Sequence, residues 1–233
     1  MKVAIMQPYL FPYIGYFQLI NCVDTFVIYD NIEYTKKGWI NRNRILVNGT
    51  DNYFTIPLKK SSDFSLVSEK EIAENFKKEL HKILNRVEAS YRKAPYFETV
   101  FPLLKKILSS NHTNLFKYIY FSLMEVLKFL EINTKIIVSS EIDIDHTLKS
   151  QSKVIAICEK LHADTYINAI GGMELYHKND FKKKDIVLGF IKSDPISYTQ
   201  FDNDFIPWLS IIDVMMFNSK GKIQEYLKSY SLQ

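Results

Sequence analysis

The sequence predicts an α/β fold with a mainly parallel sheet, and three observations lead to this prediction. Short apolar runs, such as VAIM at 3–6 and DTFVIY at 24–29, are typical of strands that are buried on both faces. Amphipathic segments such as 151–161 alternate with these runs, as expected for strand–helix–strand units. The first thirty residues already contain a strand, a proline-rich loop, a short helix and a second strand.

The remaining elements follow from the same patterns along the chain. Residues 45–58 surround Asn48-Gly49, a dipeptide that favours a tight β-hairpin turn. Charged, helix-periodic sequence fills 65–130 and predicts a helical insertion or subdomain, which leaves 1–64 and 131–233 as the α/β core. Further strands are expected at 135–139, 165–168 and 186–191, and further helices at 15–21, 65–88, 103–108, 114–130, 151–161, after Trp208 and at 223–229.

Composition narrows the class of protein. The chain has 233 residues, is 47% hydrophobic and carries a net charge of +4, which fits a globular protein and does not by itself indicate double-stranded nucleic acid as a partner. No apolar run is long enough to span a membrane, and Pro8 and Pro12 interrupt the signal-peptide-like start. The two cysteines and five histidines show no metal-ligand spacing and no disulfide framework, so we expect a cytoplasmic protein without a metal site.

Ligands of parallel sheets bind beyond the carboxyl ends of the strands, so we expect the binding residues in the loops that follow the predicted strands. The first loop starts at Gln7 and is stiffened by two prolines, and Gly15 opens the next helix, where a missing Cβ lets a ligand approach. The spacing Tyr13-Ile14-Gly15-Tyr16 resembles the H-x-G-H signature of nucleotidylyltransferases and class I synthetases, which have Rossmann-like sheets. Both histidines are tyrosines here, so the positive charge of that motif is missing. A proline-stiffened turn with buried aromatic rings remains the alternative.

The second loop, 30–44, concentrates cations, amides and one indole in KKGWINRNR at 36–44. In an extended segment, Arg42 and Arg44 share one side, where they are suited to phosphate or carboxylate oxygens. Trp39 is suited to stacking on a base or a sugar, and Asp30 to accepting a hydrogen bond from a sugar hydroxyl. A solvated basic loop is the alternative interpretation.

A third loop carries the one Gly-Gly pair of the chain, in NAIGG at 168–172. A sharp turn there presents backbone N–H groups to an anion, although the segment matches no known phosphate-binding motif, and a plain tight turn is the alternative. The chain contains no nucleophile motif of the G-x-S-x-G type. Of its five histidines, only His177 lies near one of these loops.

Five motifs in order resemble the WbqC-like family: IMQPYLFPYIGYFQLI at 5–20, DTFVIYD at 24–30, GWINRNRI at 38–45, FTIP at 54–57 and FIPWLSIIDVMMFN at 205–218. The resemblance implies a role in bacterial O-antigen or other surface-polysaccharide biosynthesis, with a proposed transfer of a glycyl (aminoacyl) group to an amino sugar. It does not imply which residues are catalytic. The loops and the resemblance together predict substrate-binding residues at Gln7, Tyr13, Gly15, Tyr16, Asp30, Trp39, Arg42, Asn43, Arg44, Asn168, Gly171, Gly172, Tyr176 and Gln200.

Two functions of different classes follow from these expectations. The first is an aminoacyl transferase that acts on a nucleotide-linked amino sugar, with ATP or an activated aminoacyl donor as co-substrate; aminoacyl-tRNA is among the candidate donors. The second is a non-catalytic sugar- or nucleotide-binding module of a glycan-assembly complex. The lack of a credible nucleophile favours the second, and turnover with glycine and ATP separates the two.

Overall fold

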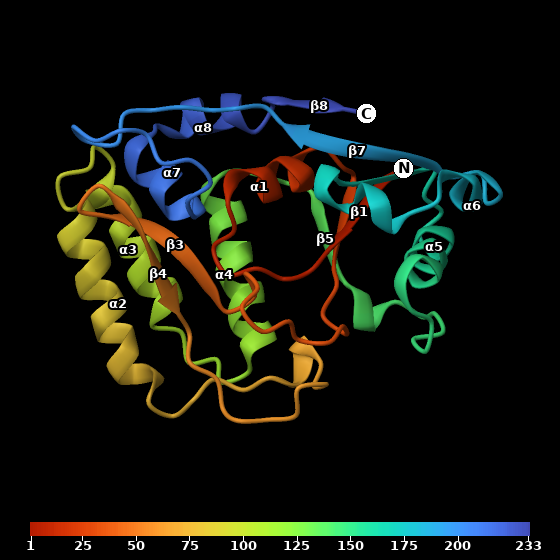
Figure 1. The fold of residues 1–233 in the computed structure, drawn as a ribbon, viewed down its shortest axis with the longest axis horizontal. Coiled ribbons are helices and arrows are strands. Elements are labelled where there is room, and N and C mark those ends of the chain that lie inside the picture. Colours follow the sequence, from red (N-terminus) through yellow and green to blue (C-terminus); the bar gives the residue numbers. More distant parts are fainter.

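The computed structural model describes residues 1–233 and contains a six-stranded sheet in the order β5-β2-β1-β6-β7-β8 (Figure 1). All neighbouring strands are parallel except the last pair. The strands are β1 (Lys2–Met6), β2 (Thr25–Ile28), β5 (Lys135–Val138), β6 (Thr165–Ala169), β7 (Val187–Ser193) and β8 (Tyr230–Leu232). The predicted α/β class with a mainly parallel, Rossmann-like sheet is confirmed, and the antiparallel edge strand β8 was not predicted.

Both faces of the sheet are buried, which explains the uninterrupted apolar runs of its strands. On β1, Ala4 belongs to a core of 48 buried residues, whereas Val3 and Ile5 belong to a second core of 13. On β2, Phe26 faces the larger core and Val27 the smaller one. Successive side chains of a strand point to opposite faces, so each strand contributes to both cores.

Helices cover the two faces unequally. The smaller core is covered by α5 (Ser150–Lys160) and α6 (Lys178–Lys182). The larger core is formed with the remaining helices, which surround the other face and the left-hand end of the molecule in Figure 1. These helices are α1 (Ile14–Asn21), α2 (Phe76–Tyr91), α3 (Phe97–Leu108), α4 (Leu115–Phe129), α7 (Ile211–Phe217) and α8 (Lys220–Tyr226).

The segment 65–130 holds α2, α3 and α4, and its side chains share the larger core with the sheet. Leu104 and Leu123 belong to the same buried cluster as Leu19 and Phe26. The first part of this segment differs from the predicted helix over 65–88. Only a single 3-10 turn, Val67–Glu69, precedes α2. The residues around it are extended, because Leu66 forms a β-bridge with Glu33 and Ile72 forms one with Leu58.

The predicted hairpin is present as β3 (Arg42–Val47) and β4 (Thr50–Thr55), separate from the main sheet. Asn48 and Gly49 both have positive φ, 50° and 76°, as a two-residue hairpin turn requires. The hairpin starts three residues earlier than predicted. As a result, Arg42 and Arg44 are on a strand instead of in a loop.

No helix of the chain has both the length and the apolar character needed to cross a membrane.

Candidate functional site

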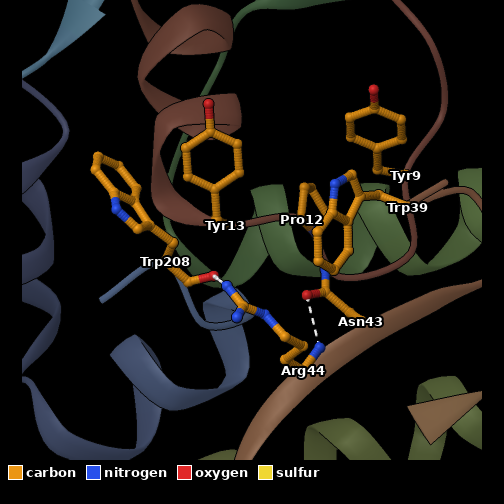
Figure 2. A pocket seen from close by; sticks show the side chains of 7 residues that line it. All are labelled: Tyr9, Pro12, Tyr13, Trp39, Asn43, Arg44 and Trp208. Atoms are coloured by element: carbon orange, nitrogen blue, oxygen red, sulfur yellow. Dashed lines mark hydrogen bonds between the residues drawn. The ribbon is translucent and has the colours of Figure 1, made fainter. Parts of the chain in front are cut away.

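A cavity of about 320 Å³ opens where the loop after β1 meets the hairpin (Figure 2). Two tyrosines, two tryptophans and a proline surround it, together with one arginine and one asparagine. A cavity of this size with mostly aromatic walls and a few polar groups is typical of small-molecule sites. The lining residues are Tyr9, Pro12, Tyr13, Trp39, Asn43, Arg44 and Trp208.

Asn43 attaches the first loop to β3. Its side chain is buried and donates hydrogen bonds to the carbonyl oxygens of Leu10 (2.9 Å) and Phe11 (2.8 Å). The backbone N–H of Leu10 also donates to the carbonyl of Trp39. These bonds hold the aromatic residues of the two loops around one space. Asn43 therefore positions the aromatic walls of the cavity. Because it precedes Arg44 on β3, the two side chains leave the strand on opposite faces.

Arg44 supplies the positive charge of the cavity. Its guanidinium forms a half-exposed ion pair with Asp51 (2.8 Å), donates to the carbonyl of Trp208 (3.3 Å) and lies 5.5 Å from the centre of the Trp39 ring. Nη1 and Nη2 each make one of these hydrogen bonds and carry a second N–H, whereas the Nε–H is fully buried and has no acceptor. The second N–H groups of Nη1 and Nη2 therefore leave this guanidinium with hydrogen-bonding capacity for a ligand.

Trp208 has two features that are unusual for a large apolar residue. Its side chain is 52% exposed, and its φ is +60°, a backbone conformation that bulky residues rarely adopt. Such strain persists where the surrounding structure enforces it, often at functional sites. The indole packs edge-on against the Tyr13 ring at 5.7 Å, and both side chains point along the wall of the cavity (Figure 2).

A second cavity of about 390 Å³ adjoins the first at this aromatic pair. It shares Tyr13 and Trp208 with the first and is mainly apolar. The side chains of Tyr13 and Trp208 therefore belong to the walls of both cavities. The other lining residues are Ile14, Pro195, Ile196, Ser197, Tyr198, Phe205, Pro207, Leu209 and Val214.

The two tyrosines of the first cavity remain neutral. Burial raises the pKa of both Tyr9 and Tyr13 above the ordinary value, and Tyr13 adds to the increase for Tyr9. In Figure 2 the two hydroxyls lie on the same side of the view, away from Arg44. They offer neutral hydrogen-bond donors at one end of the space, with the guanidinium at the other.

The missing Cβ of Gly15 serves a different purpose from the ligand approach predicted from the sequence. A Cβ at this position would lie 2.3 Å from the Tyr13 ring and 2.7 Å from the Ser193 hydroxyl. The ring of Tyr13 therefore occupies the space beside the start of α1, and Gly15 permits the ring position that shapes the cavity.

This contact gives a prediction for Gly15→Ala. The clashing atoms are ends of side chains, so they can move, and we expect the free energy of unfolding to change by less than about 1 kcal/mol. The Tyr13 ring must shift against Trp208. In a Trp39→Phe background, where Trp208 is the one remaining tryptophan, its emission maximum should move. Gly171→Ala is the matched control, because nothing lies within 4 Å of a Cβ there. Unchanged emission in Gly15→Ala would contradict the assigned packing.

Three other predicted residues have structural contacts instead of cavity contacts. Arg42 donates to the backbone carbonyls of Gly38 and Lys37 and lies over the Tyr53 ring, so it stabilises the loop that carries Trp39. Tyr16 is buried and donates to the Gln7 carbonyl (2.9 Å). Gln200 is buried and bonds to Asp213 and to both backbone groups of Ile206.

The remaining predicted residues lie elsewhere, and none of them lines either cavity. Asp30 follows β2 and is buried, and it accepts hydrogen bonds from the Ser139 hydroxyl (3.3 Å) and the Ser140 N–H (3.0 Å). The Gly-Gly segment forms a 3-10 helix, Ile170–Leu175, instead of a sharp turn. The side-chain amide of Asn168 fills the space beside Gly172. Tyr176 shares a hydroxyl contact with Tyr166 (3.1 Å).

The sequence predictions did not include Tyr9, Pro12 or Trp208. The signals were available in part, because PYLFPY at 8–13 places aromatic residues between two prolines, and Trp208 is one of only two tryptophans. The contact between the first loop and Trp208 joins residues about 200 positions apart, and no local pattern indicates it.

The site contains no group of three or more His, Cys, Asp or Glu side chains that could hold a metal ion, and neither does the rest of the chain.

The strand order β5-β2-β1-β6-β7, with helices on both faces, defines an α/β protein of the Rossmann-like class. The chain belongs to the WbqC-like protein family, whose model matches residues 7–225. It is also similar to the uncharacterized protein Rv1507c of Mycobacterium tuberculosis, with 28% identity over 230 residues that cover 97% of each chain. No solved structure matches the chain.

Proposed function

We propose that the protein binds a nucleotide-linked amino sugar in the aromatic cavity and transfers an aminoacyl group, such as glycyl, to the sugar amine. This places it in the biosynthesis of O-antigen or a related surface polysaccharide, in the cytoplasm. The observation that carries the proposal is the combination of four aromatic side chains with the guanidinium of Arg44, whose Nη1 and Nη2 each keep one N–H without a partner.

Each part of the cavity suits one part of such a ligand. Flat aromatic faces are suited to sugar rings and bases, which present apolar C–H groups and π-faces. Arginine binds phosphate oxygens through two parallel hydrogen bonds. The neutral hydroxyls of Tyr9 and Tyr13 can bond to sugar hydroxyl or amine groups. The adjoining apolar cavity offers space for a second part of the ligand.

The proposed reaction forms an amide. The amine nitrogen of the sugar attacks the carbonyl carbon of the activated aminoacyl donor, the C–N bond forms, and the bond to the donor's leaving group breaks. The nitrogen loses one proton, which passes to the released leaving group or to water. Aminoacyl adenylate made from ATP, aminoacyl-tRNA and an aminoacyl thioester are donors of the required kind.

A second candidate is a non-catalytic binding module of a glycan-assembly complex. The residues around the first cavity include no Asp, Glu, His, Cys or Lys that could accept the amine proton. This observation favours a binding role.

The two tryptophans make ligand binding directly measurable. Trp39 and Trp208 are the only tryptophans of the chain and both line this cavity, and Trp208 also lines the adjoining one, so tryptophan fluorescence reports on these two spaces. Titration with a nucleotide-linked amino sugar is expected to change the emission in a saturable way, and the free amino sugar is expected to bind more weakly because it has no phosphate for Arg44. No saturable change with any nucleotide-linked amino sugar would refute the proposal.

Mass spectrometry of the same mixtures then separates the two candidates. With glycine and ATP, or with glycyl-tRNA, a transferase yields the sugar plus one glycyl residue. A binding module gives the fluorescence response without this product.

A further inference from the structure

Lys153 is a buried lysine without a hydrogen-bonding or ionic partner. Its side chain and backbone together are 3% exposed, and its ammonium group forms neither a hydrogen bond nor an ion pair. It is not among the fully buried unpaired atoms, so the ammonium keeps a narrow access to solvent. Lysines are almost never buried unless they are paired, because removing the charge from water is unfavourable. A role beyond folding would explain why this charge is held inside.

Lys153 lies near the edge of the sheet at which the parallel strands end, where ligands of such sheets bind. It is the fourth residue of α5, which connects the parallel strands β5 and β6 and therefore begins at their carboxyl ends. Side chains of a helix tilt toward its N-terminus, so the ammonium points to this edge. The ammonium lies over the ring of Tyr29, directly after β2, in a cation–π contact with 5.1 Å between Nζ and the ring centre.

The start of α5 has its own unsatisfied donors. No side chain caps the helix, and no protein group accepts a hydrogen bond from the N–H groups of Ser150, Gln151 and Ser152. Uncapped helix N-termini attract anions because these N–H groups and the helix dipole both favour negative charge. Lys153 follows these three residues directly in the chain, so its side chain and the open N–H groups belong to the same end of α5.

Asp30 lies close by but does not neutralise Lys153. Its carboxylate forms no ion pair with the ammonium, and Oδ1 of Asp30 accepts hydrogen bonds from Ser139 and Ser140. Burial lowers the pKa of Lys153, and the charge of Asp30 opposes that effect only in part. The second oxygen of Asp30 accepts no hydrogen bond and remains available to a donor group.

We propose that Lys153 and the N-terminus of α5 form a second binding site, which takes the phosphate or carboxylate group of a small molecule. Asp30 accepts a hydrogen bond from a hydroxyl or ammonium group of the same molecule. The site is distinct from the aromatic cavity, none of whose lining residues it includes. It does not depend on the function proposed for that cavity.

Thermal unfolding of matched variants tests the site. Inorganic phosphate, ADP and glycine serve as probes. We expect at least one probe to raise the Tm of the wild type, and Lys153→Met to abolish this rise. Without a probe, the Tm of Lys153→Met should equal or exceed that of the wild type, because the substitution removes an unpaired buried charge. A rise with phosphate or ADP assigns a phosphate, and a rise with glycine assigns a carboxylate.

Two controls separate this site from others. Lys160→Met removes an exposed lysine of the same helix that is paired with Asp143, and it should keep the full response. Arg44→Ala should also keep it, because Arg44 belongs to the aromatic cavity. A response lost in Arg44→Ala and kept in Lys153→Met would overturn the proposal, as would the absence of any response in the wild type.

A measurement on the unaltered protein covers the case in which Lys153→Met does not fold. In ¹H–¹⁵N NMR spectra of the wild type, a bound probe should shift the amide signals of Ser150, Gln151 and Ser152. Shifts confined to residues around the aromatic cavity would contradict the inference.

Discussion

Asp213→Ala is expected to lower the free energy of unfolding by about 3–5 kcal/mol, because it leaves several buried donors without an acceptor. The carboxylate of Asp213 is fully buried and accepts hydrogen bonds from Tyr91 (2.8 Å), Tyr198 (2.7 Å) and Gln200 (2.7 Å). Tyr91 is the last residue of α2, whereas Tyr198 and Gln200 lie in the loop before α7. One carboxylate therefore connects segments that are far apart in the sequence. Urea denaturation of the purified variant measures the change.

Asp204→Ala is the matched control, since Asp204 is exposed and its side chain has no hydrogen-bond partner. Its stability should stay within about 0.5 kcal/mol of the wild type. Asp213→Asn keeps the shape of the side chain and one acceptor oxygen, so its free energy of unfolding should lie between those of Asp213→Ala and Asp204→Ala. A loss in Asp213→Ala no greater than in the control would show that this network does not stabilise the fold.

The same residue gives a pH dependence with a defined sign. Burial raises the pKa of Asp213 above 3.8, and the three hydrogen bonds lower it in part. The folded state thus binds the proton more strongly than the unfolded state does. This contribution to stability is complete below the unfolded pKa and is lost as the pH rises through the folded pKa. Asp213→Asn cannot ionise, so its stability should lack this decline in denaturation curves recorded across the acidic range.

Arg44→Ala is expected to weaken binding of a nucleotide-linked amino sugar about tenfold or more. Hydrogen bonds to a charged group contribute roughly 1.5–3 kcal/mol, and each 1.4 kcal/mol corresponds to a factor of ten in affinity. Arg44→Lys should not restore the affinity if the contact uses two parallel hydrogen bonds. Tryptophan fluorescence titration measures the dissociation constant of each variant.

Two variants control for charge and for packing. Arg92→Ala removes an exposed arginine whose side chain has no partner, and it should bind like the wild type. Asp51→Asn removes the ion-pair partner of Arg44 but leaves the cavity lining intact, so affinity should be kept or increased. Wild-type affinity in Arg44→Ala would mean that the guanidinium stabilises only the hairpin. Arg42→Ala is less informative, because Arg42 bonds to the backbone next to Trp39.

Much of the fold could be predicted from the sequence, because its determinants are local. The strands at 3–6 and 24–29 are fully apolar since both faces of the sheet are covered, and this pattern identifies buried parallel strands. Asn48-Gly49 favours a two-residue turn through its own backbone preferences, and the hairpin forms there. β8 was missed because Tyr230–Leu232 is short and pairs only with the edge of β7.

The candidate site was predictable only in part. The positions of Trp39, Asn43 and Arg44 followed from the alternation of side chains along an extended strand and from their residue types. The same reasoning gave Arg42 and Arg44 equal weight, because both lie on one side of the strand. Only the structure shows that Arg42 bonds to Gly38 and Lys37, whereas Arg44 faces the cavity.

By itself, the sequence determined the α/β class, the hairpin and the family membership, since these depend on local patterns and on the order of motifs. The tertiary structure decided which side chains share a space. Trp208 meets Tyr13 because α7 packs beside the first loop, where the Ile211 N–H donates to the Pro12 carbonyl. Lys153 is buried because α5 crosses the sheet from β5 to β6. Contacts between residues so far apart depend on how whole elements pack, and no local sequence pattern encodes that packing.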